Sequence, residues 1–90
     1  MTARLIHFAG HVQGVGFRYT VKQLATGFEV TGSVKNLPDG RVELWVQGDD
    51  AEVGAFVGAI RESNLRHHIK DEQQQLVPTD PKAAGFHIAL

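Results

Sequence analysis

Two hydrophobic periods meet at the stretch Val12-Gln13-Gly14-Val15-Gly16-Phe17-Arg18. Before it, residues 5–12 alternate between two faces, and a period of two predicts a half-buried strand. After it, apolar residues recur with the spacing of one helix face, and they are Phe17, Val21, Leu24, Ala25 and Phe28. The chain is therefore expected to pass from a strand to a helix through a loop that contains two glycines.

The next segment predicts a hairpin and a second helix. Residues 30–36 and 42–47 alternate on either side of Leu37-Pro38-Asp39-Gly40, a turn in which proline fixes φ and glycine accepts a positive one. The second helix opens with Asp49 as its N-cap, and Glu52 stands where it would complete a capping box. Its predicted buried stripe consists of Val53, Phe56, Val57 and Ile60.

The last third of the chain gives weaker signals. Residues 69–77 are polar enough to suit only an exposed or edge strand, and a short strand is expected over residues 86–89. The order β-α-β-β-α-β, with a short extra C-terminal strand, predicts an α+β fold in which two helices cover one face of an antiparallel sheet. We expect residues 1–90 to form a single domain.

The composition excludes several classes of protein. The chain has 90 residues, a formal net charge of −1 and no cysteine, which rules out disulfides, thiolate metal sites and a thiol nucleophile. Lysine and arginine are scattered, which argues against a nucleic-acid surface, and the five histidines fit no helical i, i+4 pair of metal ligands. Because neither a leader segment nor an apolar run of about 20 residues is evident, we expect no membrane association and a cytoplasmic location. We expect a monomer because no long apolar patch is evident.

The two glycines of the strand–helix loop, with Arg18 after them, indicate an anion site. Glycines let consecutive N–H groups converge, a helix N-terminus carries about half a positive charge, and arginine grips phosphate with two parallel hydrogen bonds. The motif is neither a dinucleotide fingerprint, because Tyr19 replaces the third glycine, nor a Walker loop. A plain strand–helix turn with a surface arginine is the alternative.

Asn36 is the second candidate. It lies in the same alternation class as Val30 and Val34, so its amide is expected to face the helix side of the sheet. A turn-forming asparagine is the alternative interpretation.

The linked motifs 12–18, Ala25, 32–36 and 39–43, with their spacing, resemble the acylphosphatase family. The resemblance implies a ferredoxin-like fold and an enzyme that hydrolyses an acyl phosphate to a carboxylate and inorganic phosphate without a cofactor. It implies Arg18 and Asn36 as catalytic residues, with Asn36 orienting the attacking water. It also implies a phosphate-binding loop made of Gln13, Gly14, Val15, Gly16, Phe17 and Arg18.

The chain departs from the family pattern at a few positions, including His11 and Ser33. At a third, Glu29 replaces a usual glycine, so the first helix is expected to stop nearer Gly27, or Glu29 to adopt a left-handed conformation.

Two other functions stay open on the sequence. An RNA-recognition module shares the element order but needs stacking aromatics where this chain has Glu43, with Trp45 as the exception. A domain of a larger carbamoyl-transfer protein would act on carbamoyl phosphate specifically. No residue of the sequence marks a site for the acyl group, so broad specificity is expected.

Overall fold

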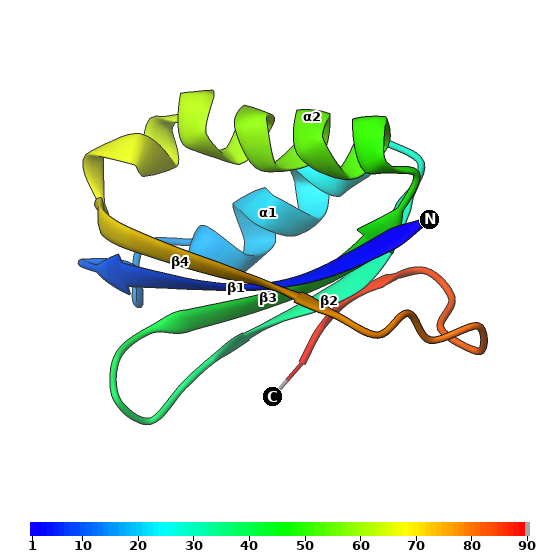
Figure 1. The fold of residues 1–90 in the computed structure, drawn as a ribbon. Coiled ribbons are helices and arrows are strands. Elements are labelled where there is room, and N and C mark those ends of the chain that lie inside the picture. Colours follow the sequence, from blue (N-terminus) through cyan, green and yellow to red (C-terminus); the bar gives the residue numbers. More distant parts are fainter. Residues whose placement is uncertain (90) are drawn as a thin grey trace.

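Two helices lie on one face of a five-stranded sheet in the computed structural model, which describes residues 1–89 (Figure 1). The 3-10 turn η1 connects the second helix to the fourth strand. The elements are β1 (Thr2–Gly10), α1 (Phe17–Ala25), β2 (Val30–Asn36), β3 (Val42–Gly48), α2 (Asp50–Glu62), η1 (Asn64–His67), β4 (Ile69–Val77) and β5 (Phe86–Ile88). No helix in this part of the chain is long and apolar enough to cross a membrane.

The sheet has the strand order β4-β1-β3-β2-β5. The first four strands pair antiparallel, which confirms the predicted ferredoxin-like α+β fold, whereas β5 pairs parallel with β2. The short extra C-terminal strand, whose direction the sequence did not predict, therefore makes the sheet mixed. The reason is topological: β4 ends beside the start of β1, and residues 78–85 deliver the chain to the opposite edge at the end where β2 begins.

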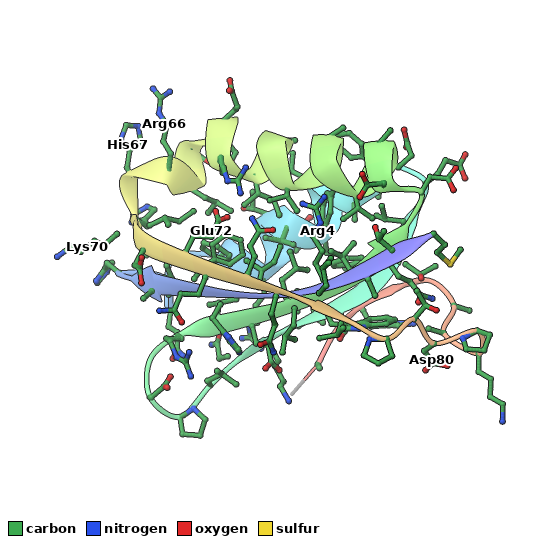
Figure 2. The ribbon with its side chains drawn as sticks, viewed as in Figure 1. Arg4, Arg66, His67, Lys70, Glu72 and Asp80 are labelled. Atoms are coloured by element: carbon green, nitrogen blue, oxygen red, sulfur yellow. The ribbon has the colours of Figure 1, made fainter. Side chains whose placement is uncertain are left out.

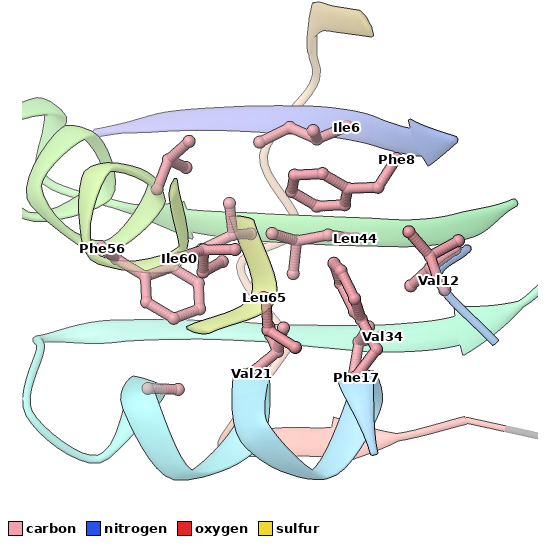
Figure 3. Packing of buried hydrophobic residues seen from close by; sticks show 14 of the residues in the cluster. Ile6, Phe8, Val12, Phe17, Val21, Val34, Leu44, Phe56, Ile60 and Leu65 are labelled. Atoms are coloured by element: carbon pink, nitrogen blue, oxygen red, sulfur yellow. The ribbon is translucent and has the colours of Figure 1, made fainter. Parts of the chain in front are cut away.

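The core lies between the sheet and the helices. The predicted stripe of α2 is fully buried, and β1 and β3 contribute their alternate side chains. Val12 and Phe17 flank the loop between β1 and α1, and Figure 3 places both at the same end of the core as Val34. The ring of Phe17 packs against that of Phe8 with centroids 5.2 Å apart. Burying side chains of this size contributes about 1.5–3 kcal/mol each, so the core anchors both ends of the loop.

The ends of the two helices agree with the sequence-based predictions only in part. Helix α1 ends at Ala25, before Gly27, and Glu29 keeps a negative φ, so the first of the two alternatives for this segment is confirmed. Asp49 is the N-cap of α2, but the predicted capping box is wrong. The carboxylate of Glu52 instead accepts a hydrogen bond of 2.8 Å from the backbone N–H of Glu29, which ties α2 to the start of β2.

Strand β4 forms one edge of the sheet, as predicted for residues 69–77. Its polar side chains are largely exposed, and Figure 2 shows Lys70 reaching outward at its start. On its helix side, Glu72 accepts a hydrogen bond of 2.9 Å from Nε of Arg61 on α2. The edge strand is thus fastened to the helix layer through one charged pair.

Candidate active site

A hollow of about 190 Å³ opens at the N-terminus of α1. The loop between β1 and α1, the first turn of α1, the end of β2 and the end of β5 form its walls. The lining residues are Val12, Gly14, Gly16, Phe17, Arg18, Tyr19, Asn36 and Ile88. The fold thus places Arg18 and Asn36, the two residues that the family resemblance implies as catalytic, in the wall of one hollow, although they come from two different elements.

Two glycines give the loop its shape. Gly14 and Gly16 have φ values of 79° and 77°, a region that glycine enters without strain. A Cβ atom at either position would meet nothing within 4 Å, so the requirement for glycine is set by the backbone angle and not by lack of space. Both glycines are exposed, which leaves the backbone of the loop open to a ligand.

The first turn of α1 points its unpaired N–H groups toward this loop. Gly16 is the N-cap, and its carbonyl accepts the first helical hydrogen bond, 3.0 Å from the N–H of Thr20. The N–H groups of residues 17–19 precede that bond and therefore have no helical acceptor. Together they give this helix end a partial positive charge of about half a unit.

Arg18 is the only charged residue that lines the hollow within residues 1–89. The first turn of α1 contains no acidic residue, so no carboxylate of that turn competes for the guanidinium. A cation at a helix N-terminus opposes the helix dipole, and a bound anion would relieve that opposition. The hollow is therefore suited to a small anion.

The acidic groups of the neighbouring hairpin are engaged elsewhere. Asp39 accepts hydrogen bonds of 3.0 Å from the backbone N–H of Arg41 and 2.8 Å from its Nε, and these hold the pKa of Asp39 below its usual range. On the sheet face away from the helices, partial burial would raise the pKa of Glu43. Hydrogen bonds from His7 and Lys35 outweigh that effect and lower it.

Gln13 has a different environment from the rest of the predicted loop. Its side chain turns away from the hollow and donates hydrogen bonds of 2.8 Å to the carbonyl of Leu37 and 3.0 Å to that of Arg41. Leu37 directly follows Asn36, so this amide fastens the glycine loop to the strand end that carries Asn36. Val15 does not line the hollow either; it packs against the core.

Two residues of the lining were missed by sequence reasoning. Tyr19 follows Arg18 directly, and its position in the first turn of a helix that opens at an anion loop was a usable signal. Ile88 comes to the hollow through the parallel pairing of β5 with β2, for which no local signal exists. Trp45, by contrast, lies on the uncovered face of the sheet beside Ser33 and His87, as its alternation predicts. Residues 1–89 contain no group of three or more side chains suited to hold a metal ion.

Comparison with known proteins gives the family of this chain. The family model for acylphosphatase matches residues 5–88. The acylphosphatase of Clostridium acetobutylicum is 36% identical over 88 residues, which is 98% of this chain and 97% of the relative. The crystal structure of acylphosphatase from Bacillus subtilis superposes with a TM-score of 0.90 at 32% identity and covers 100% of both chains.

A much longer protein contains a similar unit. The structure of HypF from T. kodakarensis aligns with a TM-score of 0.85 and 30% identity over 100% of this chain but only 12% of its own. The family model and the full-length relatives nevertheless agree on one assignment. The chain belongs to the acylphosphatase family.

Proposed function

We propose that this chain hydrolyses the carboxyl–phosphate anhydride of acyl phosphates, with phosphate held by residues 13–18 and water oriented by Asn36. One observation carries the proposal: Arg18 and Asn36, which come from two different elements, line the same hollow at the N-terminus of α1. The family assignment supports the same reaction.

The chemistry needs little more than charge and position. The oxygen of water attacks phosphorus while the bond from phosphorus to the carboxyl oxygen breaks, and the electron pair of that bond leaves on the carboxylate. The protons of the water stay on the phosphate product, which releases one of them to solvent according to the pH. A carboxylic acid has a pKa near ~4, so this leaving group departs without a general acid. The remaining tasks are to neutralise the phosphoryl oxygens and to place the water.

Each task has a candidate group. Arg18 and the N–H groups of Gly14 to Phe17 would bind the phosphoryl oxygens, because Arg18, Gly14, Gly16 and Phe17 line the hollow and Val15 lies between the two glycines. The side-chain carbonyl oxygen of Asn36 would accept a hydrogen bond from the attacking water and so orient the lone pair of the water toward phosphorus. Gln13 contributes its backbone to the loop, while its side chain holds the loop against the hairpin.

The test is hydrolysis of benzoyl phosphate by the wild type, Arg18→Ala and Asn36→Ala, each verified as folded by circular dichroism. Removing one group that stabilises transition-state charge typically lowers kcat by about 10²–10³-fold, and we expect losses of this size in both variants. Arg66→Ala and Asn64→Ala, exposed positions of η1, are the matched controls and should retain activity within about twofold. A folded wild type without activity would overturn the proposal.

A second candidate is a domain that acts on carbamoyl phosphate only. This candidate is supported by the match of the chain to 12% of the longer HypF chain, because a similar unit there forms part of a larger protein. Rates on carbamoyl phosphate and benzoyl phosphate separate the two candidates. The general acylphosphatase hydrolyses both, whereas the specific domain leaves benzoyl phosphate intact.

We further propose that the protein works in the cytoplasm as a single-domain monomer. The absence of cysteine fits a reducing compartment. Light scattering behind a sizing column tests the monomer, and a mass of twice 9.8 kDa would contradict it.

A further inference from the structure

Two exposed apolar side chains border the hollow that holds Arg18 and Asn36. In residues 1–89, large hydrophobic side chains are exposed at four positions: Met1, Tyr19, Leu76 and Ile88. Only Tyr19, 63% exposed, and Ile88, 36% exposed, line the hollow. Exposed apolar surface that adjoins a site is where an apolar part of a ligand would bind.

The fold places each apolar side chain next to a group of the proposed phosphate site. Tyr19 follows Arg18 in the first turn of α1. Ile88 pairs with Val34 of β2, two residues before Asn36. The hollow therefore has charged and polar groups together with apolar ones, drawn from the same two regions of the fold. This combination matches an acyl phosphate, which has an anionic end and an organic end.

The charged side chain that lines the hollow indicates which acyl groups could bind there. Arg18 is the only charged side chain among the lining residues in the described part of the chain, and the proposed reaction already uses it for phosphate. A second carboxylate on the acyl group would find no cation of its own there. The aromatic ring of Tyr19 and the branched side chain of Ile88 would instead shield an apolar acyl group from water.

We infer that Tyr19 and Ile88 form an acyl subsite that favours acyl phosphates with aromatic or branched apolar acyl groups over acetyl phosphate. This inference rests on the proposed function and replaces the expectation that no residue contacts the acyl group. Because the subsite is open to solvent on one side, the discrimination falls in the lower part of the 10–200-fold range that hydrophobic pockets reach for small apolar groups.

The test compares kcat/KM for benzoyl phosphate and acetyl phosphate in the wild type, Tyr19→Ala and Tyr19→Phe. Comparing each variant with the wild type cancels the different intrinsic reactivities of the two substrates. Tyr19→Ala should lower the benzoyl-to-acetyl ratio about tenfold, with kcat/KM for acetyl phosphate and inhibition by inorganic phosphate within about twofold of the wild type. Tyr19→Phe keeps the ring and should keep the ratio.

Ile88→Ala should lower the ratio as well, by about threefold, because its side chain is smaller and less exposed. The matched control is Leu76→Ala, which removes a large side chain that is 76% exposed on β4, away from the hollow, and should leave the ratio unchanged.

Equal losses on both substrates in Tyr19→Ala would mean that Tyr19 supports the loop without contacting the acyl group, which overturns the inference. An unchanged ratio would overturn it too, while the proposed function would stand. If the wild type hydrolyses neither substrate, the proposed function fails, and the inference fails with it.

Discussion

Two loops at opposite ends of the sheet are each fastened by one glutamine (Figure 1). In the loop between β1 and α1, the amide nitrogen of Gln13 donates to two carbonyls of the β2–β3 turn, at 2.8 and 3.0 Å. In the connection of residues 78–85, Gln47 of β3 donates to the carbonyl of Asp80 and accepts from its N–H, both at 2.8 Å. Figure 2 shows Asp80 at the end of the molecule away from Lys70.

The two loops differ in what they hold. The Gln13 loop carries the glycines and Arg18 and is tied to the residue after Asn36, so its fastening joins the two halves of the proposed active site. The Gln47 contact joins the 78–85 connection to the uncovered face of the sheet, next to Trp45. A half-buried glutamine therefore positions the proposed active site at one end of the sheet. At the other end, a second glutamine holds the 78–85 connection against the sheet.

Among changes to these loop contacts, the largest effect is expected from Gln13→Ala. It removes one of the two donors of each carbonyl, because the Leu37 carbonyl still accepts from the N–H of Gly40 and the Arg41 carbonyl from that of Leu37. Losing two such hydrogen bonds, at about 0.5–1.5 kcal/mol each, should lower the free energy of unfolding by about 1–3 kcal/mol. Because displacements of about 1 Å between reacting groups cost large factors in rate, kcat for benzoyl phosphate should also fall about tenfold or more. Urea denaturation and steady-state kinetics measure the two effects.

Gln13→Glu sharpens this prediction because it keeps the size of the side chain and replaces the donor with a carboxylate that faces two carbonyls. It should be less stable than Gln13→Ala. A stable Gln13→Ala protein with wild-type kcat would show that the fastening does not position the site.

Gln47→Ala should affect stability alone. Gln47 is 4% exposed, and its loss should lower the free energy of unfolding by about 1–3 kcal/mol and loosen residues 78–85, seen as faster amide hydrogen exchange at Asp80. At a temperature where the variant is fully folded, kcat should stay within about twofold of the wild type. A drop in kcat as large as that of Gln13→Ala would contradict the prediction that only the Gln13 contact positions the active site.

Local rules were sufficient for most of the fold and for the side of the sheet on which Asn36 lies. The change of period at residues 12–18 predicts β1 and α1, the alternation predicts the hairpin, and Asn36 lines the hollow on the side that its parity indicates. These features depend on neighbours within a few residues, where spacing and backbone preference decide the outcome.

Apart from Tyr19, which had a local signal, the features that the sequence did not predict depend on distant partners. Glu52 bonds to Glu29 and not to its own helix end, because the fold brings that free N–H within reach. The side chain of Gln13 finds its acceptors in a turn more than 20 residues away, and β5 takes its direction from where β4 ends. Local preference carries no information about such contacts, so the capping box was predicted wrongly and the parallel direction of β5 was not predicted.

The smallest effect is expected from the contact between Arg61 and Glu72, which ties β4 to α2. Unlike the contacts of the two glutamines, it joins two charged side chains. The hydrogen bond from Arg61 holds the pKa of Glu72 below its usual range. A carboxyl whose pKa is lower in the folded than in the unfolded protein adds stability above the unfolded pKa, near ~4.3, and loses that contribution as the pH falls through the folded value. Neutral hydrogen bonds such as those of Gln13 and Gln47 have no such dependence.

Glu72→Gln should therefore be less stable than the wild type by at most about 1 kcal/mol at pH 7, since Arg61 is half exposed, and the gap should narrow as the pH falls from 5 to 3. Urea denaturation at several pH values measures the gap. Glu62→Gln, an exposed position of α2 that makes no ion pair within residues 1–89, is the control and should follow the wild type. A gap that stays constant down to pH 3 would mean that Glu72 holds the edge strand by packing and not by charge.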